Sequence, residues 1–508
     1  DPDANAILTY SLVDGNGSTD NALFTLDANG TLKTAATFDY ESNASSYSIR
    51  VQAKDEYNAT VEEAFTVTLS NVNEPTTGSV SILGNAIVGH TLSVQNTLAD
   101  PDGLGSITYN WYRGGQPIIH GGTLRDGING VDGLDKVYSL AVSSDGRHVY
   151  STARNDNTVN WFERNSSSGE LSYIGLLRDG AAGVEGLDGA NDVIVSEDGK
   201  NVYVTASDDD SVSWFVRNTI TGALTYAGQV KDGAGGVSRL DGVQDISISG
   251  DGKNVYAVSS LEDALIRFGV DLSTGVLSDY GALVDGDNGV NGLDGARGII
   301  LSSDGLSAYA IGYDDNKVSW YSRAQDPIYK GILTHGGWLK DGPTYGVDGL
   351  DRPYDLVISP DGNYLYVASS GDHAVSWFTR NSGTGALIYQ GRAKQGESGV
   401  INLHSPRFVT LSPDGKHAYV LSYKAVGGSV GDAVLWFNRN SATGALSYVG
   451  SLKDGENGVD GLDYPAQIAF SSDGLNAYIA GLEDDSISWY PETHKKFHKI
   501  FWCRIKQV

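Results

Sequence analysis

A four-residue motif, Ser-x-Asp-Gly, recurs seven times in the chain of 508 residues and constrains the fold more than any other feature. Each copy precedes a short run that ends in tyrosine, as in SSDGRHVY and SPDGNYLY. Successive motif aspartates are 53, 53, 53, 57, 53 and 59 residues apart. A nearly fixed period of this length is the signature of a repeat architecture. The motif aspartates are Asp145, Asp198, Asp251, Asp304, Asp361, Asp414 and Asp473.

Each repeat is predicted to form four short strands. In the second repeat the strand-like runs are Val193–Ser196, Asn201–Ala206, Val212–Arg217 and Ala223–Gly228, with Gly, Asp and Asn between them. Alternating β-branched and aromatic residues bounded by these turn formers are typical of strands, and no window has a convincing helical period. Seven such units predict an all-β fold whose main domain, residues 117–490, is a seven-bladed β-propeller.

The ends of this domain indicate how the ring closes. The seventh repeat has three good strands through Tyr490, but the chain then reads PETHKKFHKI instead of a fourth strand. A matching strand, Pro117–Leu124, lies at the front of the domain and precedes RDG, as the other fourth strands do. We expect it to complete blade seven, because this pairing removes an exposed sheet edge.

Residues 1–75 resemble a cadherin repeat cut at its front, through the pieces DPDAN, YSL, FDYE, AKD and NVNEP in this order. The resemblance implies an N-terminal β-sandwich with Ca²⁺ at the domain junctions, since Ca²⁺ requires hard oxygen ligands. The alternative is that these residues are ordinary solvated turn residues. The implied ligands are Asp1, Asp3 and Asp55 for an upstream junction, and Asp39, Glu41, Asn71, Asn73 and Glu74 for the downstream one.

Two further segments flank the propeller. Residues 76–116 look like the first half of a bacterial immunoglobulin-like repeat with Trp111 in its core, or else form a linker. Residues 491–508 are an atypical basic tail that the repeat does not predict, and we expect this tail to be adventitious or disordered. The tail holds the single cysteine, Cys503, which excludes an intramolecular disulfide framework and any multi-cysteine metal site.

Residues 117–490 resemble the lactonase-like seven-bladed propellers, including the YVTN-type surface repeats, through the motifs S-P-D-G-K-x-x-Y and T-G-A-L. These motifs are specific for a fold, and one fold hosts many functions. Two recurrent features have two interpretations each. The third-strand tryptophans, such as Trp161, are expected to pack between blades rather than to stack on a carbohydrate. The acidic loops at one rim either attract cations or a basic partner, or simply form turns.

An enzyme would need convergent groups at the central mouth. In the family, catalysis is thought to use His, Glu and Arg in this funnel, but the first strands here, such as DKVYSLAVS, lack a histidine-rich motif. An arginine could hold a substrate carboxylate and a histidine or aspartate could act as a base. The alternative is that these side chains only line the channel. The candidates are Arg297, His404, Arg407 and Asp245.

Charge and composition narrow the function. The formal net charge of −28 argues against nucleic acid and anionic membrane surfaces as partners. No apolar run is long enough for direct membrane insertion. We expect an extracellular or cell-surface protein of bacterial type, part of a longer multidomain chain. In this interpretation Ca²⁺ stiffens the cadherin-like domain, and the propeller binds a protein or glycan ligand in adhesion. The alternatives are a lactone hydrolase acting at the propeller mouth, and a structural surface-layer protein.

Overall fold

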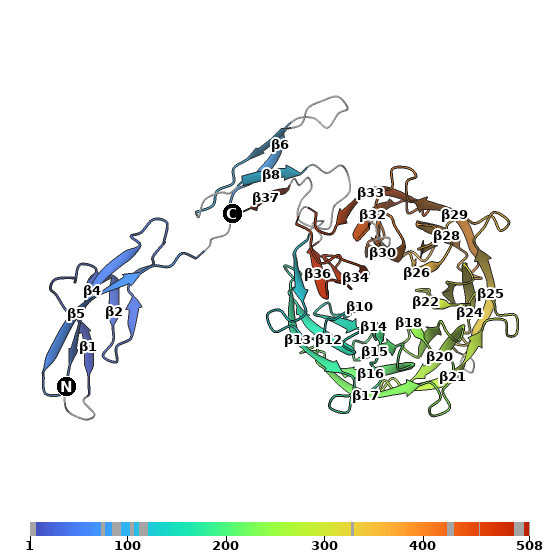
Figure 1. Ribbon diagram of the computed structural model, residues 1–508, viewed down its shortest axis with the longest axis horizontal. Helices are drawn as coiled ribbons and strands as arrows, with labels where there is room; N and C mark the ends of the chain where they lie inside the picture. Colours follow the sequence, from blue (N-terminus) through green and yellow to red (C-terminus); the bar gives the residue numbers. More distant parts are fainter. Residues whose placement is uncertain are drawn as a thin grey trace. The chain divides into compact units, whose positions relative to one another are not determined.

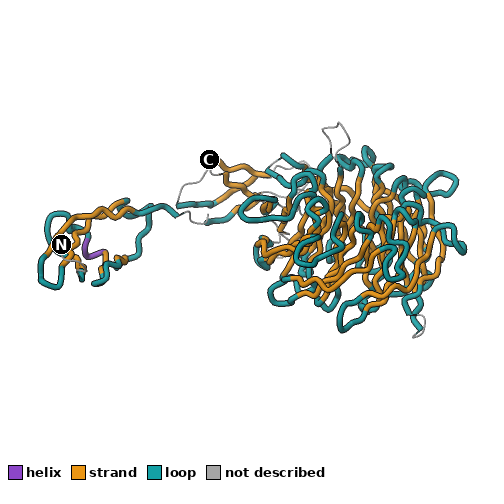
Figure 2. The backbone as a smooth tube through the Cα atoms, turned by 60° about the horizontal axis from the view of Figure 1, so that its bottom comes forward, coloured by secondary structure: helices purple, strands orange, loops and turns teal. Residues whose placement is uncertain are grey.

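The computed structural model describes residues 7–72, 77–83, 93–101, 106–110, 120–326, 330–423, 431–456, 458–491 and 502–506. The chain forms two compact units, Gly114–Lys496 and Asp1–Arg113 together with Phe497–Val508. Figure 2 shows a chain of strands and loops, and a single 3-10 turn is its helical element in the described ranges. No described helix is long and apolar enough to cross a membrane.

The larger unit is a ring of seven four-stranded antiparallel sheets, in which the first strand of each sheet lies innermost (Figure 1). This confirms the predicted seven-bladed propeller. Blades one to four comprise β10 (Val137–Val142), β11 (His148–Ala153), β12 (Thr158–Arg164) and β13 (Leu171–Arg178); β14 (Ala190–Val195), β15 (Asn201–Ala206), β16 (Ser211–Arg217) and β17 (Leu224–Lys231); β18 (Val243–Ile248), β19 (Asn254–Ser259), β20 (Ala264–Val270) and β21 (Leu277–Val284); and β22 (Ala296–Leu301), β23 (Ser307–Gly312), β24 (Lys317–Arg323) and β25 (Leu333–Lys340).

Blade seven takes its outer strand from the front of the propeller, as predicted. Strand β9 pairs antiparallel with β36, with Gly122 opposite Trp489 and Arg125 opposite Ser486. Blades five to seven comprise β26 (Pro353–Ile358), β27 (Tyr364–Ser369), β28 (Ala374–Arg380) and β29 (Leu387–Lys394); β30 (Pro406–Leu411), β31 (His417–Ser422), β32 (Ala433–Arg439) and β33 (Leu446–Lys453); and β34 (Pro465–Phe470), β35 (Asn476–Gly481), β36 (Ser486–Pro491) and β9 (Gly122–Arg125).

The hydrophobic core lies between neighbouring blades. One cluster joins Tyr150 and Trp161 of blade one to Val193 and Phe215 of blade two, and equivalent clusters follow around the ring. Trp161 is 7% exposed and lies opposite Gly175 on the adjacent strand, where a larger residue would meet the indole ring. The prediction that the third-strand tryptophans pack between blades is therefore confirmed for Trp161 and for its buried equivalents Trp214, Trp377 and Trp436.

A buried arginine at the end of the third strand ties each of five blades to the preceding one. Arg217 donates from Nε to the Tyr150 hydroxyl at 2.6 Å and from Nη2 to Asp145 of the first Ser-x-Asp-Gly motif at 3.0 Å. It also donates to the carbonyl oxygen of Gly199 at 2.9 Å. The repeated motif thus does more than form a turn, because its aspartate anchors the next blade. The five arginines are Arg164, Arg217, Arg323, Arg380 and Arg439.

The smaller unit has a small aromatic core. Phe38 and Tyr47 lie with ring centroids 4.7 Å apart, beside the buried Phe24 and Ile49. Two sheets of three and two strands enclose this core, an arrangement that does not by itself establish a cadherin sandwich. The elements are β1 (Thr9–Leu12), β4 (Ser46–Lys54) and β5 (Thr60–Thr68) in one sheet, β2 (Phe24–Leu26) and β3 (Leu32–Thr34) in the other, and the 3-10 turn η1 (Asn21–Leu23).

The segment expected to be a partial immunoglobulin-like repeat or a linker contributes three strands to the same unit. Strands β6 (Val80–Leu83) and β7 (Ser93–Asn96) pair with each other. Strand β8 (Ser106–Asn110) pairs with β37 (Trp502–Lys506), so this part of the basic tail has regular structure that the sequence did not predict. Trp111 lies outside the described residues.

Candidate active site at the propeller mouth

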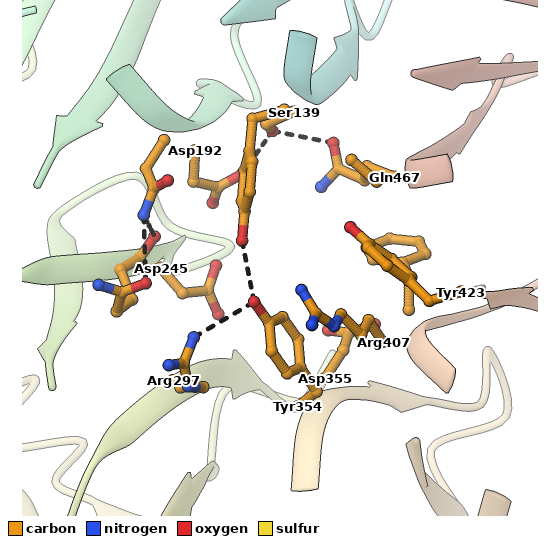
Figure 3. A pocket seen from close by; sticks show the side chains of 14 residues that line it. Ser139, Asp192, Asp245, Arg297, Tyr354, Asp355, Arg407, Tyr423 and Gln467 are labelled. Carbon is orange, nitrogen blue, oxygen red and sulfur yellow. Dashed lines mark hydrogen bonds between the residues drawn. The ribbon is translucent and has the colours of Figure 1, made fainter. Parts of the chain in front are cut away.

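A pocket of about 80 Å³ lies at the centre of the ring, where the innermost strands begin (Figure 3). Most of its lining comes from the second and third residues of these strands. In all seven innermost strands the pairing register shifts at the second residue, as between Val137 and Ser139 in β10. A β-bulge of this kind re-aims a side chain. The lining residues are Tyr138, Ser139, Asn191, Asp192, Gln244, Asp245, Arg297, Tyr354, Asp355, Arg407, Phe408, Tyr423, Ala466 and Gln467.

The third residues link the innermost strands to one another. Asp245 Oδ2 accepts the backbone N–H of Ile299 in the next blade at 2.7 Å, and Asp355 Oδ2 accepts that of Val409 at 2.8 Å. Ser139, Asp192 and Gln467 make the same bond at three other blade interfaces. Asp245 therefore lies at the pocket, but both of its oxygens accept backbone N–H groups, since Oδ1 also accepts that of Ile246 at 2.9 Å.

Burial disfavours the charged form of these carboxyl groups. It raises the pKa of Asp355 to about 7, against the backbone hydrogen bonds, which lower it. It also raises the pKa of Asp192 and, with the nearby charge of Asp192, raises that of Asp245 well above its usual value. The two adjacent carboxyl groups therefore do not both ionise readily at neutral pH.

The second residues form the polar centre of the pocket, in which Tyr354 lies between two arginines. Arg297 donates to the Tyr354 hydroxyl at 3.2 Å, and the Tyr138 hydroxyl lies 3.2 Å from the same oxygen (Figure 3). The guanidinium carbons of Arg297 and Arg407 lie 4.8 and 4.9 Å from the Tyr354 ring centroid. Arg407 also lies over the ring of Tyr423, at 4.1 Å. Each arginine is thus held by aromatic faces.

The arginines also govern the ionisation of the tyrosine. Burial raises the pKa of Tyr354, but the charges of Arg297 and Arg407 lower it more, so the net shift is downward. The pKa of Tyr138 moves the opposite way, well upward, because it is buried and faces the negative form of Tyr354. Tyr138 therefore keeps its proton and donates to Tyr354 when the latter ionises.

Both arginines keep unused donors. The Nε atoms of Arg297 and Arg407 are buried and have no hydrogen-bond partner. Neither guanidinium forms an ion pair with a carboxylate among the described residues. A strongly acidic protein thus has two guanidinium groups with unpartnered Nε donors at the centre of its propeller. This arrangement suits an anionic group or a developing oxyanion.

His404 lies apart from this centre. It is not among the lining residues of the pocket, and its ring faces that of His373 at 5.9 Å. Burial and the charge of His373 lower the pKa of His404. Of the four candidates from the sequence, the structure therefore brings Arg297, Arg407 and Asp245 together and leaves His404 out.

Part of the acidic rim is paired with basic side chains of the propeller. Among the described residues, three groups of carboxylates lie close enough to share a metal ion, and each contacts a basic side chain. In the first, Arg178 pairs with Asp132 at 3.2 Å and with Asp156 at 3.3 Å. Asp126 and Asp156 also accept backbone N–H groups of the turn. The turn-forming interpretation of these loops explains their contacts. The groups are Asp126, Asp132 and Asp156; Asp341, Asp348 and Asp372; and Asp454, Asp460 and Asp484.

The expected calcium ligands lie in the smaller unit or outside the described residues. Asp39 and Glu41 are exposed in one turn, where Asp39 Oδ1 accepts the Glu41 N–H at 3.1 Å. Asp55 caps the turn between β4 and β5 by accepting two N–H groups. Asn71 is exposed at the end of the same unit. The described residues thus show oxygen-rich turns without a shared group of acidic ligands. Asp1, Asp3, Asn73 and Glu74 are not described.

Sequence reasoning missed the tyrosines of the pocket. Tyr138, Tyr354 and Tyr423 stand in or next to strands, where tyrosine ordinarily indicates packing. A signal was present, however. When the repeats are aligned on their motifs, the second residue of the first strand varies among Tyr, Asn, Gln, Arg and Ala, whereas the first is always Val, Ala or Pro.

Residues 130–238 match the family model described as "Lactonase, 7-bladed beta-propeller". No curated protein matches the sequence significantly. A periplasmic gluconolactonase of Pseudomonas aeruginosa, PpgL, is 19% identical with a TM-score of 0.50, over 63% of this chain and 85% of that one. A putative 6-phosphogluconolactonase from Bacteroides uniformis is 20% identical with a TM-score of 0.49, over 62% and 84%. The Cps50 (Swd1) propeller domain of Myceliophteria thermophila is 15% identical with a TM-score of 0.52, over 74% and 100%. The chain thus contains a lactonase-like seven-bladed propeller, and the structural likeness shows its fold alone.

Proposed function

We propose that the propeller hydrolyses a lactone whose substituents include an anionic group, at the central pocket. The observation that carries this proposal is the pair of arginines with unused donors on either side of Tyr354. The lactonase family match over residues 130–238 supports it against a role in adhesion. A purely structural role for the channel does not explain these unused arginine donors.

The two arginines and Tyr354 have separate roles in the proposed reaction. Arg297 and Arg407 bind the substrate's anionic group or the oxygen that becomes negative as water attacks the carbonyl carbon. Tyr354 acts as the base, because the arginines favour its phenolate. It takes a proton from the attacking water, the hydroxide oxygen bonds to the carbonyl carbon, the carbon–oxygen bond of the ring breaks, and the alkoxide leaving group takes the proton back from Tyr354. The product is the open hydroxy acid.

The size of the pocket limits how a substrate sits. About 80 Å³ accommodates roughly two or three water molecules at about 30 Å³ each. The pocket therefore takes one charged or carbonyl group, and the sugar ring lies above it at the mouth. Tyr313, whose ring faces Arg297 with a centroid distance of 4.6 Å, and Tyr464, 4.8 Å from the Tyr423 ring, supply aromatic surface next to the arginines.

The test is a lactonase assay of the full chain with 6-phosphogluconolactone as the anionic substrate and uncharged gluconolactone as the comparison. We expect Arg297→Gln and Arg407→Gln to lower kcat/KM by about 100-fold or more. Tyr354→Phe is expected to lower kcat by about 100-fold and to remove the increase of kcat with pH. His404→Ala and the surface variant Arg147→Gln should retain full activity, since neither side chain lines the pocket. Wild-type turnover no faster than the buffer reaction, or full activity in Arg297→Gln, overturns the proposal.

Calcium binding, adhesion to a protein or glycan, and an extracellular or cell-surface location stay predictions for this chain. Calcium remains compatible with the exposed oxygen ligands of the smaller unit, Asp39, Glu41, Asp55 and Asn71. It has less reason to bind the propeller rim, where Arg178 and its equivalents already pair with the carboxylates. A calcium-dependent smaller unit and a hydrolytic propeller are compatible in one chain.

A further inference from the structure

The arginine tie between neighbouring blades is absent at one well-described interface. Five third strands end in the tie-forming arginine, but β20 of blade three ends in Val270. The acceptors that hold the arginine elsewhere come from the preceding blade and from the strand's own Ser-x-Asp-Gly turn. At the interface between blades two and three these acceptors remain, and the side chain that would use them is gone.

The neighbouring interface between blades three and four shows the complete arrangement. Arg323 donates from Nε to the Tyr256 hydroxyl at 2.9 Å and from Nη2 to Asn254 Oδ1 at 2.9 Å. It also donates to Asp251 Oδ1 at 3.4 Å and to the Gly305 carbonyl oxygen at 3.3 Å. The side chain is only 3% exposed, so the four acceptors form a closed socket for a planar guanidinium.

The same four acceptor types surround a cavity at the interface between blades two and three. Their positions in the repeats match those of the residues around Arg323. The cavity measures about 430 Å³, within the roughly 300–1,000 Å³ of small-molecule sites. Val270 and Leu272 supply an apolar wall. The matching acceptors are Tyr203, Asn201, Asp198 and Gly252.

These acceptors have unused capacity. Asn201 is 8% exposed, and its side chain makes no hydrogen bond among the described residues. The fully buried Tyr203 donates its hydroxyl proton to the Gly275 carbonyl at 3.1 Å, whereas its equivalent Tyr256 also accepts from an arginine. Asn201 lines the cavity, so its side-chain oxygen can accept from a donor bound there, as Asn254 Oδ1 accepts from Arg323.

One lysine also lies at the cavity. Lys200 approaches Asp198 at 3.4 Å, but both side chains are largely exposed, at 68% and 46%, and such a pair contributes little. The filled socket has a lysine at the same place in its turn, Lys253, whose backbone N–H bonds to Asp251 just as that of Lys200 bonds to Asp198. A lysine at this position is therefore compatible with a bound guanidinium.

We propose that this cavity binds a guanidinium group from outside the propeller, either the side chain of an arginine in a peptide or a small guanidinium compound. The planar cation offers five N–H donors to the four acceptors and stacks its face on the apolar wall. An ammonium group offers three donors from one point, which cannot reach all four acceptors. The site lies between the Ser-x-Asp-Gly turns of two blades and does not include any residue of the central pocket.

The test is calorimetric titration of the full chain with methylguanidinium and with acetyl-arginine amide. We expect saturable binding at one site, and binding of methylammonium at least 10-fold weaker. Binding of acetyl-arginine amide supports a peptide arginine as the source, and binding confined to methylguanidinium supports a small free cation. Val270→Arg should fill the socket from within, abolish binding and raise the Tm.

A second variant tests the proposal without relying on how well the arginine introduced by Val270→Arg fits the socket. Asp198→Asn removes the charge of the socket from a partly exposed side chain and should weaken binding about 10-fold. Asp287→Asn, an equally conservative change in an exposed loop outside the cavity, should leave the affinity unchanged. No saturable binding to the wild type, or equal binding by the wild type and Val270→Arg, overturns the proposal.

Discussion

At the scale of single residues, several ionisable groups of the pocket have pKa values shifted from their ordinary values. The Asp355 carboxylate accepts a hydrogen bond from the Val409 N–H, and burial, which disfavours its charged form, raises its pKa to about 7. Tyr354 moves in the opposite direction, because two arginines outweigh its burial and lower its pKa. The same pocket thus shifts the pKa of a carboxyl group upward and that of a tyrosine downward.

The raised pKa of Asp355 predicts a loss of stability on going from acid to neutral pH. An unfolded Asp has a pKa of about 3.9, so folding favours the protonated form, and this contribution is fully present below about pH 4 and lost as the pH rises through about 7. At about 1.36 kcal/mol per unit, the change is at most about 4 kcal/mol. Asp355→Asn keeps an acceptor for Val409 and should lose this pH dependence in urea unfolding between pH 4.5 and 8. Asp287→Asn is the control, and parallel pH profiles of wild type and Asp355→Asn contradict the prediction.

The sequence allowed some of the pocket residues to be placed. Arg297, Arg407 and Asp245 could be located at the mouth because the repeat puts them at the start of innermost strands, and their catalytic roles stay predictions. Tyr354 and Tyr138 could not be located, because strict strand alternation does not show that a bulge turns the second residue into the channel. His404 lies outside the pocket lining, since proximity in sequence to Arg407 does not place it on the bulged strand.

At the scale of elements, the blade interface depends on one buried cation as well as on packing. Arg380 is 2% exposed and donates to the Tyr309 hydroxyl, the Gly362 carbonyl and the Asp304 carboxylate. Five interfaces share this device. Aspartate and arginine lie about one and a half repeats apart in the sequence, so only the assembled propeller shows that they meet.

Loss of one tie should destabilise the ring measurably. Arg380→Met removes the guanidinium from Asp304 and from the Tyr309 hydroxyl, which keeps its bond to the Gly385 carbonyl, and breaking a buried pair in this way costs on the order of 3 kcal/mol. Arg147→Met, an exposed arginine whose side chain makes no hydrogen bond among the described residues, should change stability by less than about 0.5 kcal/mol. The measurement is unfolding in urea, a denaturant without guanidinium ions. Equal urea midpoints for Arg380→Met and Arg147→Met would show that the arginine tie contributes no net stability.

At the scale of the whole molecule, the two units differ in how many ion pairs their described carboxylates form. In the propeller, several rim carboxylates pair with its own arginines and lysines, such as Arg178, Arg392 and Arg125. The described ion pairs of the smaller unit comprise Arg50 with Glu62, and Asp39 is an exposed carboxylate outside that pair. Repeat spacing was enough to predict the ring, its seven blades and its closure. The aperiodic smaller unit gave no equivalent constraint.

This difference predicts which unit responds to chelation. If the smaller unit binds calcium, EDTA should lower its Tm by several degrees relative to excess CaCl₂ and leave the propeller transition unchanged. Tryptophan fluorescence reports mainly on the propeller, because seven of the nine tryptophans lie within residues 120–491, and circular dichroism reports on both units. Superimposable circular dichroism melts with EDTA and with calcium would refute calcium binding, and a shifted fluorescence melt would assign the metal to the propeller.

The closing strand has a mechanical consequence. Strand β9 is held to β36 by four residue pairs and is the first propeller strand that the chain enters after residues 1–113. A pull transmitted along the backbone from that end reaches this short seam before any other strand of the ring. The β9–β36 pairing therefore sets the load that the ring withstands. A force applied to the chain before β9 would open blade seven first, while the other blades, each formed from one continuous stretch of chain, stay intact.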